Sequence, residues 1–332
     1  MNKRLKRSYK YQCKTCQNKL QKRGKTATGR QRWFCKFCTE SAVKKRLDLS
    51  HSFVLEKFVS WLLGKLSQDE LDGSSRTFRD QTAWCWDVTP KPTLTGEIHH
   101  AVIVDGIRVG RMSCLIARTT KYVITWVWVP YESSEYWIHL FRLLPMPKYI
   151  VCDGQKGLLK ALAICWPDVI IQRCRFHAWL NIKSKLTLQP EYKASQELLQ
   201  LTRDLLHITT RLQARRWKRQ LKYWYRKHKK FIDERTIKYN PKQGERRWRY
   251  THERLRSAYR QLHKITDDLL RSSYRISPRL SHNTNHIEGG INSQIRTKLK
   301  LHRGMPQTHR MRMVDWYLFS RTEGQKPPRK CL

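Results

Sequence analysis

The strongest constraint on the fold is a change of hydrophobic pattern near residue 97. Three runs rich in β-branched and aromatic residues follow one another directly, and two further runs are separated by helical patterns. Strands in direct succession favour antiparallel pairing, whereas strands separated by helices favour parallel crossovers. We therefore predict an α/β fold with a mixed sheet. The five predicted strands are IHHAVIVDGIRVG, SCLIA, YVITWVWV, KYIVCDG and VIIQRC.

The charge of the chain indicates a polyanionic partner. The 332 residues include 68 Lys or Arg against 26 Asp or Glu, which gives a formal net charge of +42. Basic side chains that neutralise phosphates release counterions, and this favours nucleic-acid binding. The chain can also build cores, because 39% of its residues are hydrophobic and 13 are Trp. The Trp content argues against a ribosome-like or structural basic protein.

Two Cys-x-x-Cys pairs near the start of the chain predict a zinc ribbon. The pairs are Cys13 with Cys16 and Cys35 with Cys38, and 18 residues separate the inner cysteines. The first 50 residues hold 16 Lys or Arg and two acids, so this segment has little core without a metal. Four thiolates close the coordination shell, which makes the predicted Zn²⁺ structural. The alternative is two unrelated pairs of reduced cysteines.

The remaining cysteines are scattered through apolar segments, which favours a reducing compartment. The N-terminus MNKRLKRSYK lacks the apolar region of a secretory signal. The longest apolar run, YVITWVWV, is too short to span a bilayer. We expect a cytoplasmic protein with no membrane partner.

A helical pattern with an internal stop follows the predicted zinc ribbon. Phe53, Phe58 and Trp61 belong to an apolar stripe with helical spacing, and Gly73-Ser74-Ser75 ends one helix and caps the next. This arrangement predicts a helix-turn-helix-like module. The candidate DNA contacts at the start of its second helix are Arg76, Thr77 and Arg79. A plain helical linker explains the same residues.

The segment after the predicted sheet is basic and is expected to be helical. Between Arg203 and Lys264 there are 21 Lys or Arg against five acids, with aromatic residues interleaved. One interpretation is a solvated helical face with aromatics packed beneath it. The favoured interpretation is a nucleic-acid groove, in which some aromatics stack on bases. The aromatic candidates are Trp217, Trp224 and Trp248.

Three acids are candidates for metal-dependent chemistry. Asp105 and Asp153 lie at or near the ends of predicted strands, and Glu288 is the one acid between Leu269 and Val314. Neighbouring strands lie about 4.8 Å apart, so carboxylates on them can share a divalent ion, with a third carboxylate supplied by a packed helix. Such a site suits Mg²⁺ and phosphoryl transfer.

Each acid also has a structural interpretation. Asp105-Gly106 fits a type I′ hairpin turn, although Gly110 offers a later turn that would leave Asp105 inside the first strand. Asp153 can cap the following helix, and Glu288 can belong to a capping box. For each acid taken singly, the structural interpretation is at least as good as the metal-site interpretation. The order strand-Asp, strand-Asp, helix-Glu in a basic chain favours the metal site.

The sequence resembles the Mutator-type bacterial insertion-sequence transposases, a group of the DDE superfamily with an RNase H-like core. The resemblance runs from about residue 97 to 320. It rests on VIVDG, YIVCDGQKGLLKAL, QRCRFHAWLNI and TNHIEGGINSQIR. Cys174 and His177 match the family's Cys-x-x-His signature, and a buried structural pair is their alternative role. The two Gly after Glu288 weaken a helix there, so the glutamate lies on a first turn or a kink.

The resemblance implies that Asp105, Asp153 and Glu288 bind Mg²⁺ or Mn²⁺ as the catalytic triad, and that Arg296 contacts the scissile DNA. The expected partners are the element ends and target DNA, bound by a homodimer in the nucleoid, without a small-molecule substrate. A metal-independent tyrosine or serine recombinase and a non-catalytic zinc-ribbon regulator remain the alternatives. The expected units are 1–50 (zinc ribbon), 51–90 (helix-turn-helix-like), 97–188 (first part of the core), 189–270 (basic helical insertion), 271–322 (core completion with the catalytic helix) and 323–332 (tail).

Overall fold

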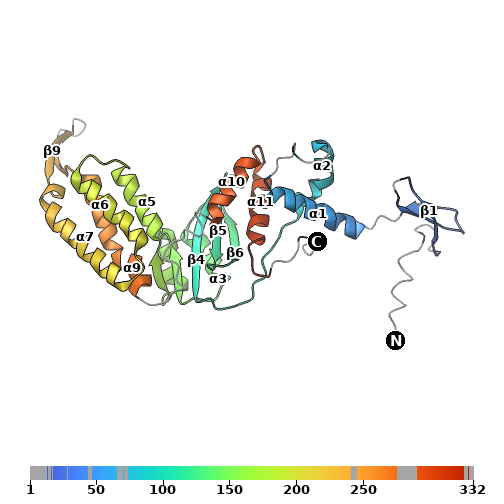
Figure 1. Ribbon diagram of the computed structural model, residues 1–332, viewed down its shortest axis with the longest axis horizontal. Coiled ribbons are helices and arrows are strands. Elements are labelled where there is room, and N and C mark those ends of the chain that lie inside the picture. Colours follow the sequence, from blue (N-terminus) through green and yellow to red (C-terminus); the bar gives the residue numbers. More distant parts are fainter. Residues whose placement is uncertain are drawn as a thin grey trace.

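The computed structural model describes residues 13, 16, 18–27, 29–43, 47–65, 70, 74–240, 245–274, 290–324 and 328. Figure 1 shows an elongated arrangement with a central sheet between a helical bundle and the N-terminal helices. None of the helices within these ranges is long and apolar enough to cross a membrane.

The central sheet is mixed, as the sequence predicts. Its strand order is β6-β5-β4-β7-β8, with β4, β5 and β6 antiparallel and β4, β7 and β8 parallel. The β4–β5 turn contains Gly110, whose φ of 59° is the left-handed conformation that glycine adopts easily. Asp105 therefore lies inside a strand and not in a hairpin turn. The strands are β4 (Ala101–Val109), β5 (Met112–Arg118), β6 (Val123–Val129), β7 (Tyr149–Cys152) and β8 (Ile170–Arg173).

Helices pack on both faces of this sheet. On one face α3 (Ser134–Arg142) and α4 (Lys156–Cys165) share a core with even-numbered residues of β4 and β7, such as Val104 and Ile150. On the other face α10 (Ser293–Leu301) and α11 (Gln307–Phe319) share a core with odd-numbered residues, such as Ile103 and Val151. The alternation of strand side chains thus divides the buried residues into two cores.

A buried aspartate fixes α11 to the edge strand of the sheet. Asp315 Oδ1 accepts hydrogen bonds from the indole nitrogens of Trp126 and Trp128 on β6, at 2.8 and 2.7 Å. Arg312 donates to the other carboxylate oxygen at 3.0 Å. These bonds satisfy a carboxylate that would otherwise be costly to bury.

The N-terminal helices share a core with the sheet region. The helix α1 (Leu47–Leu63) buries Leu55, Phe58 and Leu62 in the cluster that contains Val314 of α11. The turn after it leads to α2 (Ser75–Thr82) and a 3-10 helix, η4 (Ala83–Asp87). His302 shares a hydrogen bond of 3.1 Å with the carbonyl of Leu62 near the end of α1. The predicted pair of helices is therefore built onto the sheet region.

The insertion after β8 contains five α-helices and, unexpectedly, a β-ribbon. The sequence predicts helix throughout, but β9 (Arg235–Asn240) and β10 (Glu245–Tyr250) pair in antiparallel register. The signal was the turn-forming NPKQG between runs with alternating β-branched and aromatic residues. The helices of the insertion are α5 (Arg175–Leu186), α6 (Lys193–Asp204), α7 (Arg211–Ile232), α8 (Glu253–Lys264) and α9 (Thr266–Tyr274), with the 3-10 helix η5 (Leu205–His207) after α6.

Buried polar side chains join the insertion to the sheet. Gln172 on β8 donates to the carbonyl of Leu269 at 2.9 Å and accepts from the backbone N–H of Ser272 at 2.8 Å. Arg175, which is fully buried, donates to the Leu269 carbonyl at 2.8 Å and to Ser272 Oγ at 3.2 Å. It also donates to the Ile208 carbonyl. The start of α5 is thus bonded to the end of α9, which closes the bundle against the sheet.

Candidate active site

Two of the predicted catalytic acids lie side by side on parallel strands. Ile103 of β4 is opposite Val151 of β7, and Asp105 and Asp153 follow these two residues at the same offset. Adjacent strands lie about 4.8 Å apart, so the register brings the two carboxylates together at the end of β7. Asp105 also shares the face of Ile103 and Ile107, against which α10 and α11 pack.

Asp105 is a buried carboxylate with polar neighbours from two elements. Only 8% of the surface of Asp105 is exposed. Asn292, just before α10, donates to Asp105 Oδ2 at 3.1 Å, and the backbone N–H of Gly106 donates to Oδ1 at 3.0 Å. The pKa of Asp105 is raised to about 7, chiefly by burial. Within this net rise, His177 acts to lower the pKa and the Asp153 carboxylate acts to raise it.

A third carboxylate, that of Glu132 in the loop after β6, lies beside Gly106, the residue that follows Asp105 on β4. It stands where a side chain on Gly106 would be, so glycine at 106 leaves room for it. Burial and the charge of Asp153 both raise the pKa of Glu132. Sequence patterns assign Glu132 no special role, because the residue follows an edge strand and lies 27 positions from Asp105. Its one signal was scarcity: residues 98–188 contain five acids in all.

The turn after Asp153 holds a cation beside the acids. Gly154 has a φ of 75°, and the guanidinium of Arg173 occupies the space that a Cβ at 154 would need. Asp153 Oδ1 accepts from the backbone N–H of Gln155 at 2.9 Å, which fixes the carboxylate at the start of α4. The Asp-Gly pair therefore both orients the acid and admits the arginine.

The Cys-x-x-His signature lies on the first turn of α5. Cys174 is the N-cap residue, is buried, and its backbone N–H donates to the Cys152 carbonyl at 2.8 Å. His177, one turn later, interacts electrostatically with Asp105. The pair therefore has one structural member and one member that faces the acids.

Glu288 lies outside the described residues. The described chain resumes at Gly290 and continues as one helical segment into α10. Asn292, which bonds to Asp105, is four residues beyond Glu288 in the sequence.

The comparison with known families matches one part of the chain. Residues 118–265 match the family model described as "Transposase, Mutator family". This stretch, which is less than half of the chain, is therefore similar to Mutator family transposases. The matched stretch contains Glu132, Asp153, Cys174 and His177, and it ends before Glu288 and begins after Asp105. No curated protein matches the chain.

A second candidate metal site lies beside the N-terminal sheet, which consists of β1 (Gln21–Lys25), β2 (Gln31–Phe34) and β3 (Ser41–Val43). Cys13 and Cys38 Sγ lie 3.4 Å apart, as do those of Cys16 and Cys35. The four sulfurs lie within 4.8 Å of one another, close enough to hold a zinc ion. In the metal-free cluster, hydrogen bonds from Asn18 lower the pKa of Cys16 to about 6, whereas the hydrogen bond with Cys13 and burial raise that of Cys38 to about 12. The thiols thus share protons that a zinc ion would displace.

The candidate DNA contacts predicted from the sequence divide into exposed and buried residues. Arg76, Thr77 and Arg79 are exposed on α2, and Arg296 is exposed on α10. Trp217 and Trp224 are each 2% exposed and belong to the core of the insertion. Their indole nitrogens donate to the carbonyls of Leu201 and Ala194, at 2.7 and 3.0 Å. Burial leaves these two rings no free face for a base.

Trp248 differs from these two residues, because 53% of its surface is exposed on β10. Of the three predicted aromatic contacts, it alone offers a ring to solvent.

Proposed function

We propose that this protein is a DDE transposase that cleaves DNA and transfers strands of an insertion sequence with divalent metal ions. Asp105, Asp153 and Glu288 are the proposed catalytic residues. The observation that carries the proposal is the register of β4 and β7, which brings Asp105 and Asp153 to one point of the sheet. The strand order β6-β5-β4-β7-β8, with helices on both faces, supports an RNase H-like core.

The carboxylates fit a divalent cation by charge and donor type. Burial and neighbouring acids raise the pKa values of Asp105 and Glu132, and a cation between the acids would offset this repulsion. Oxygen ligands are those that Mg²⁺ prefers. Within the described ranges, only the four cysteines bring three or more ligand atoms within 4.8 Å, so the acidic site needs a further ligand.

Glu288 is the proposed further ligand. Four residues of extended chain span at most about 14 Å. Glu288 is therefore within reach of the acids, because Asn292 already bonds to Asp105. Gly290, the first residue described after it, has open space around its Cα.

The protein residues position the DNA and the reacting groups. Asp105 and Asp153 would hold the metal ions, which would supply activation of a water or a 3′-hydroxyl and charge stabilisation of the leaving oxygen. Arg173 beside Gly154 offers a guanidinium for the non-bridging oxygens of the scissile phosphate. Arg296, one helical turn beyond Asn292 and exposed, contacts the adjacent DNA strand. Water first cuts the end of the element, and the freed 3′-hydroxyl then attacks the target.

The N-terminal part recognises the ends of the element in this proposal. A Zn²⁺ held by Cys13, Cys16, Cys35 and Cys38 fixes the fold of the small sheet. Arg76, Thr77 and Arg79 lie on one exposed side of α2, while Phe78 between them is buried in the shared core. The three side chains are thus held on a rigid helix that can meet the DNA. A homodimer would bring two active sites to the two ends.

The test is metal-dependent DNA cleavage and strand transfer. The substrate is a plasmid that carries the genomic segments flanking the gene, incubated with Mg²⁺ or Mn²⁺. We expect Asp105→Asn, Asp153→Asn and Glu288→Gln each to lower the rate by about 10²–10³-fold or more, the range for loss of one preorganised charge-stabilising group. DNA affinity in EDTA should stay within about twofold of the native protein.

Asp168→Asn and Glu135→Gln are the matched controls, because both acids are exposed and lie in the same part of the chain. They should retain native activity. Near-native activity in all three triad variants would refute the assignment, and so would cleavage at full rate in EDTA.

A further inference from the structure

The β-ribbon of the insertion has one face that is both apolar and basic. The register places Ile237 directly opposite Trp248 and Arg235 directly opposite Tyr250. Opposite residues in an antiparallel pair share a face. Ile237 is 70% exposed and Trp248 is 53% exposed. We call these four residues the ribbon face.

Cations are stacked on the aromatic rings of the ribbon face. The Arg235 guanidinium lies 4.3 Å from the centroid of the Trp248 ring, and Arg256 of α8 lies 3.8 Å from that of Tyr250. Trp248 and Tyr250 meet edge to face, with their centroids 5.3 Å apart. Stacking fixes the aromatic rings at little entropic cost and keeps the arginines close to any ligand of the ribbon.

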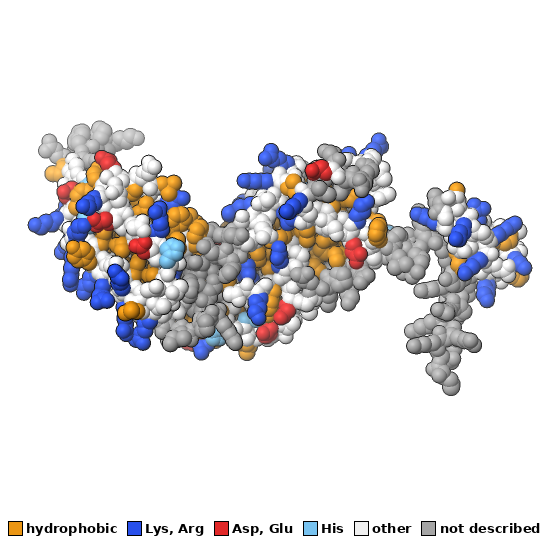
Figure 2. All heavy atoms as spheres, in the orientation of Figure 1, with side chains coloured by type: hydrophobic (Ala, Val, Ile, Leu, Met, Phe, Trp, Pro, Cys, Tyr) orange, Lys and Arg blue, Asp and Glu red, His pale blue; other side chains and the backbone are white. Residues whose placement is uncertain are grey.

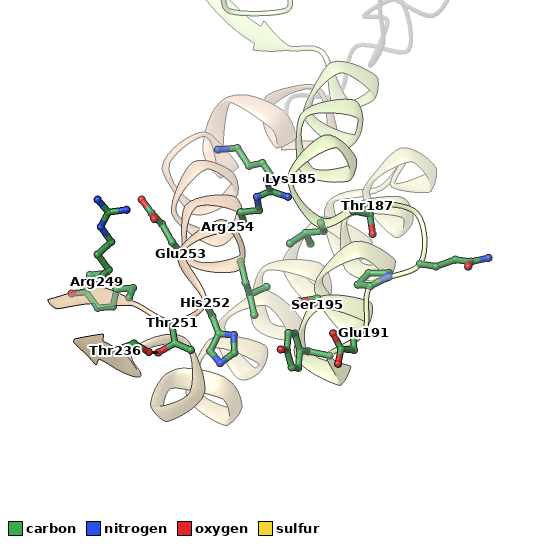
Figure 3. Close-up of a pocket in the computed structure, with 16 residues that line it drawn as sticks. Lys185, Thr187, Glu191, Ser195, Thr236, Arg249, Thr251, His252, Glu253 and Arg254 are labelled. Atoms are coloured by element: carbon green, nitrogen blue, oxygen red, sulfur yellow. Dashed lines mark hydrogen bonds between the residues drawn. The ribbon is translucent and has the colours of Figure 1, made fainter. Parts of the chain in front are cut away.

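The opposite face of the ribbon is turned toward the helices of the insertion. Thr236 and Arg249 line a cavity of about 670 Å³ together with residues of the α5–α6 connection (Figure 3). The hydroxyl groups of Thr236 and Thr251 are 2.6 Å apart at the base of the ribbon. The ring of His252 stacks on Phe231 of α7, with centroids 3.7 Å apart. These contacts fix the base of the ribbon to the helices, while the Ile237–Trp248 pair of the ribbon face stays exposed.

The ribbon face continues into a basic cleft along α8. This cleft of about 770 Å³ is lined by Tyr250 at the base of the ribbon and by the exposed side of α8. Its cationic side chains are Arg256, Arg260 and Lys264, and Glu253 is its one acidic lining residue among the described ones. In Figure 1, β9 lies at the end of the insertion farthest from the sheet. Figure 2 shows many Lys and Arg side chains over the helices of the insertion.

We propose that the ribbon face enters a groove of duplex DNA while Arg260 and Lys264 on α8 contact the phosphates of the same duplex. The major groove accepts a two-stranded β-ribbon. The exposed Ile237–Trp248 pair then contacts base edges or sugars, and the cleft follows the backbone. The excess of 21 Lys or Arg over five acids between Arg203 and Lys264 favours a polyanion over a protein partner. This inference rests on the proposed DNA role and adds a second DNA contact far from the catalytic acids.

The experiment is an anisotropy titration of a labelled duplex with the full-length protein at several salt concentrations in EDTA. Trp248→Ala should weaken binding about fivefold or more at every salt concentration, because ring contacts with bases do not depend on counterions. Arg260→Gln should lower the salt slope by about one phosphate contact. Tyr223→Ala is the control, since Tyr223 is an equally exposed aromatic residue on α7 (67% exposed) and lies outside the ribbon face.

Two outcomes would overturn the inference. One is a Trp248→Ala affinity that equals that of the Tyr223→Ala control. The other is unchanged DNA affinity together with a loss of self-association in sedimentation, which would assign the ribbon face to a second copy of the chain. Binding in EDTA does not require the catalytic carboxylates. Failure of the catalytic proposal would therefore appear in the cleavage assay and leave this result unchanged.

Discussion

The sheet and the insertion use their acidic residues in opposite ways. In the insertion, acids are paired with cations at the surface: Glu197 with Lys227 at 2.8 Å, Asp268 with Arg271 at 3.0 Å, and Asp267 with Lys218. In the sheet region, Asp105 and Glu132 have raised pKa values, chiefly because of burial, and the charge of Asp153 contributes to both.

This difference separates structural charges from chemical ones. An exposed ion pair contributes between zero and about 1 kcal/mol and tolerates replacement. A buried carboxylate with a raised pKa destabilises the metal-free fold at neutral pH, so the presence of Asp105 indicates a function that outweighs this cost. The aromatic residues of the insertion show a parallel contrast, because Trp217 is in the core and Trp248 is on the surface. The predictions below test these contrasts.

The largest expected effect on stability is at Trp217. Trp217→Ala removes a ring that is 2% exposed and a hydrogen bond to the Leu201 carbonyl, so it should lower the free energy of unfolding by about 3–5 kcal/mol. Trp248→Ala should change it by less than about 0.5 kcal/mol, because the ring is half exposed. Denaturant unfolding followed by circular dichroism measures both. Equal losses would contradict the division into core and surface rings.

A second prediction concerns the pH dependence of stability in EDTA. The pKa of Asp105 is about 7 in the folded chain against an ordinary value of 3.8, so the folded state holds this proton more tightly than the unfolded state. The free energy of unfolding should therefore fall as pH rises from about 4 to 7, by at most on the order of 4 kcal/mol from this group.

Asp105→Asn should remove this loss. Relative to the native protein, the variant should gain stability across that pH window and be constant above it, and Mg²⁺ should narrow the difference above pH 7. Asp168→Asn is the control. If the difference in free energy of unfolding between the native protein and the Asp105→Asn variant does not change with pH, Asp105 is not protonated in the folded state.

The joint between the two regions should be the next most sensitive feature. Arg175→Met leaves the buried carbonyls of Leu269 and Ile208 without this donor and should lower the free energy of unfolding by about 2–3 kcal/mol. Arg254→Met, at an exposed position on α8, is the control. Thermal unfolding combined with limited trypsin digestion would show whether the insertion opens first. If Arg175→Met lowers the free energy of unfolding by less than about 0.5 kcal/mol, contacts other than those of Arg175 hold the insertion to the sheet.

The smallest predicted effect is at the start of α7. Thr210 and Gln213 form a capping box, in which the backbone N–H of Gln213 donates to Thr210 Oγ at 3.2 Å. Thr210→Ala should lower the free energy of unfolding by about 1 kcal/mol. Thr210→Ser keeps the capping hydroxyl and should therefore keep most of this stabilisation. Denaturant midpoints distinguish the two, and equal losses in both would show that the hydroxyl does not cap the helix.

Much of the sheet could be predicted from local patterns. Four of the five strands lie within the predicted runs, and β5 extends one residue beyond its run at each end, because period-two alternation and β-branched residues report local backbone preference. The turn at Gly110 was also foreseeable, because glycine readily adopts the positive φ that the turn requires. The ribbon was missed because Lys and Arg within both of its strands resemble the basic helical pattern on either side.

The exposure of the tryptophans could not be read from spacing. Trp217 and Trp224 are seven residues apart on one side of α7, a pattern that fits either a buried stripe or a row of base contacts. The packing of α6, α8 and α9 decides between them, because these helices cover that side.

The sequence by itself determined the element types of the central sheet, the zinc-ligand spacing and the chain order of the acids, because each depends on residues close together in the chain. Tertiary structure alone decided the surroundings of Asp105. Asn292 is 187 residues away and reaches Asp105 only through helix packing, and Glu132 follows an edge strand yet lies beside Gly106 of β4. Burial is likewise a property of the assembled layers, so the raised pKa of Asp105 and the exposed Ile237–Trp248 pair arise only in the folded protein.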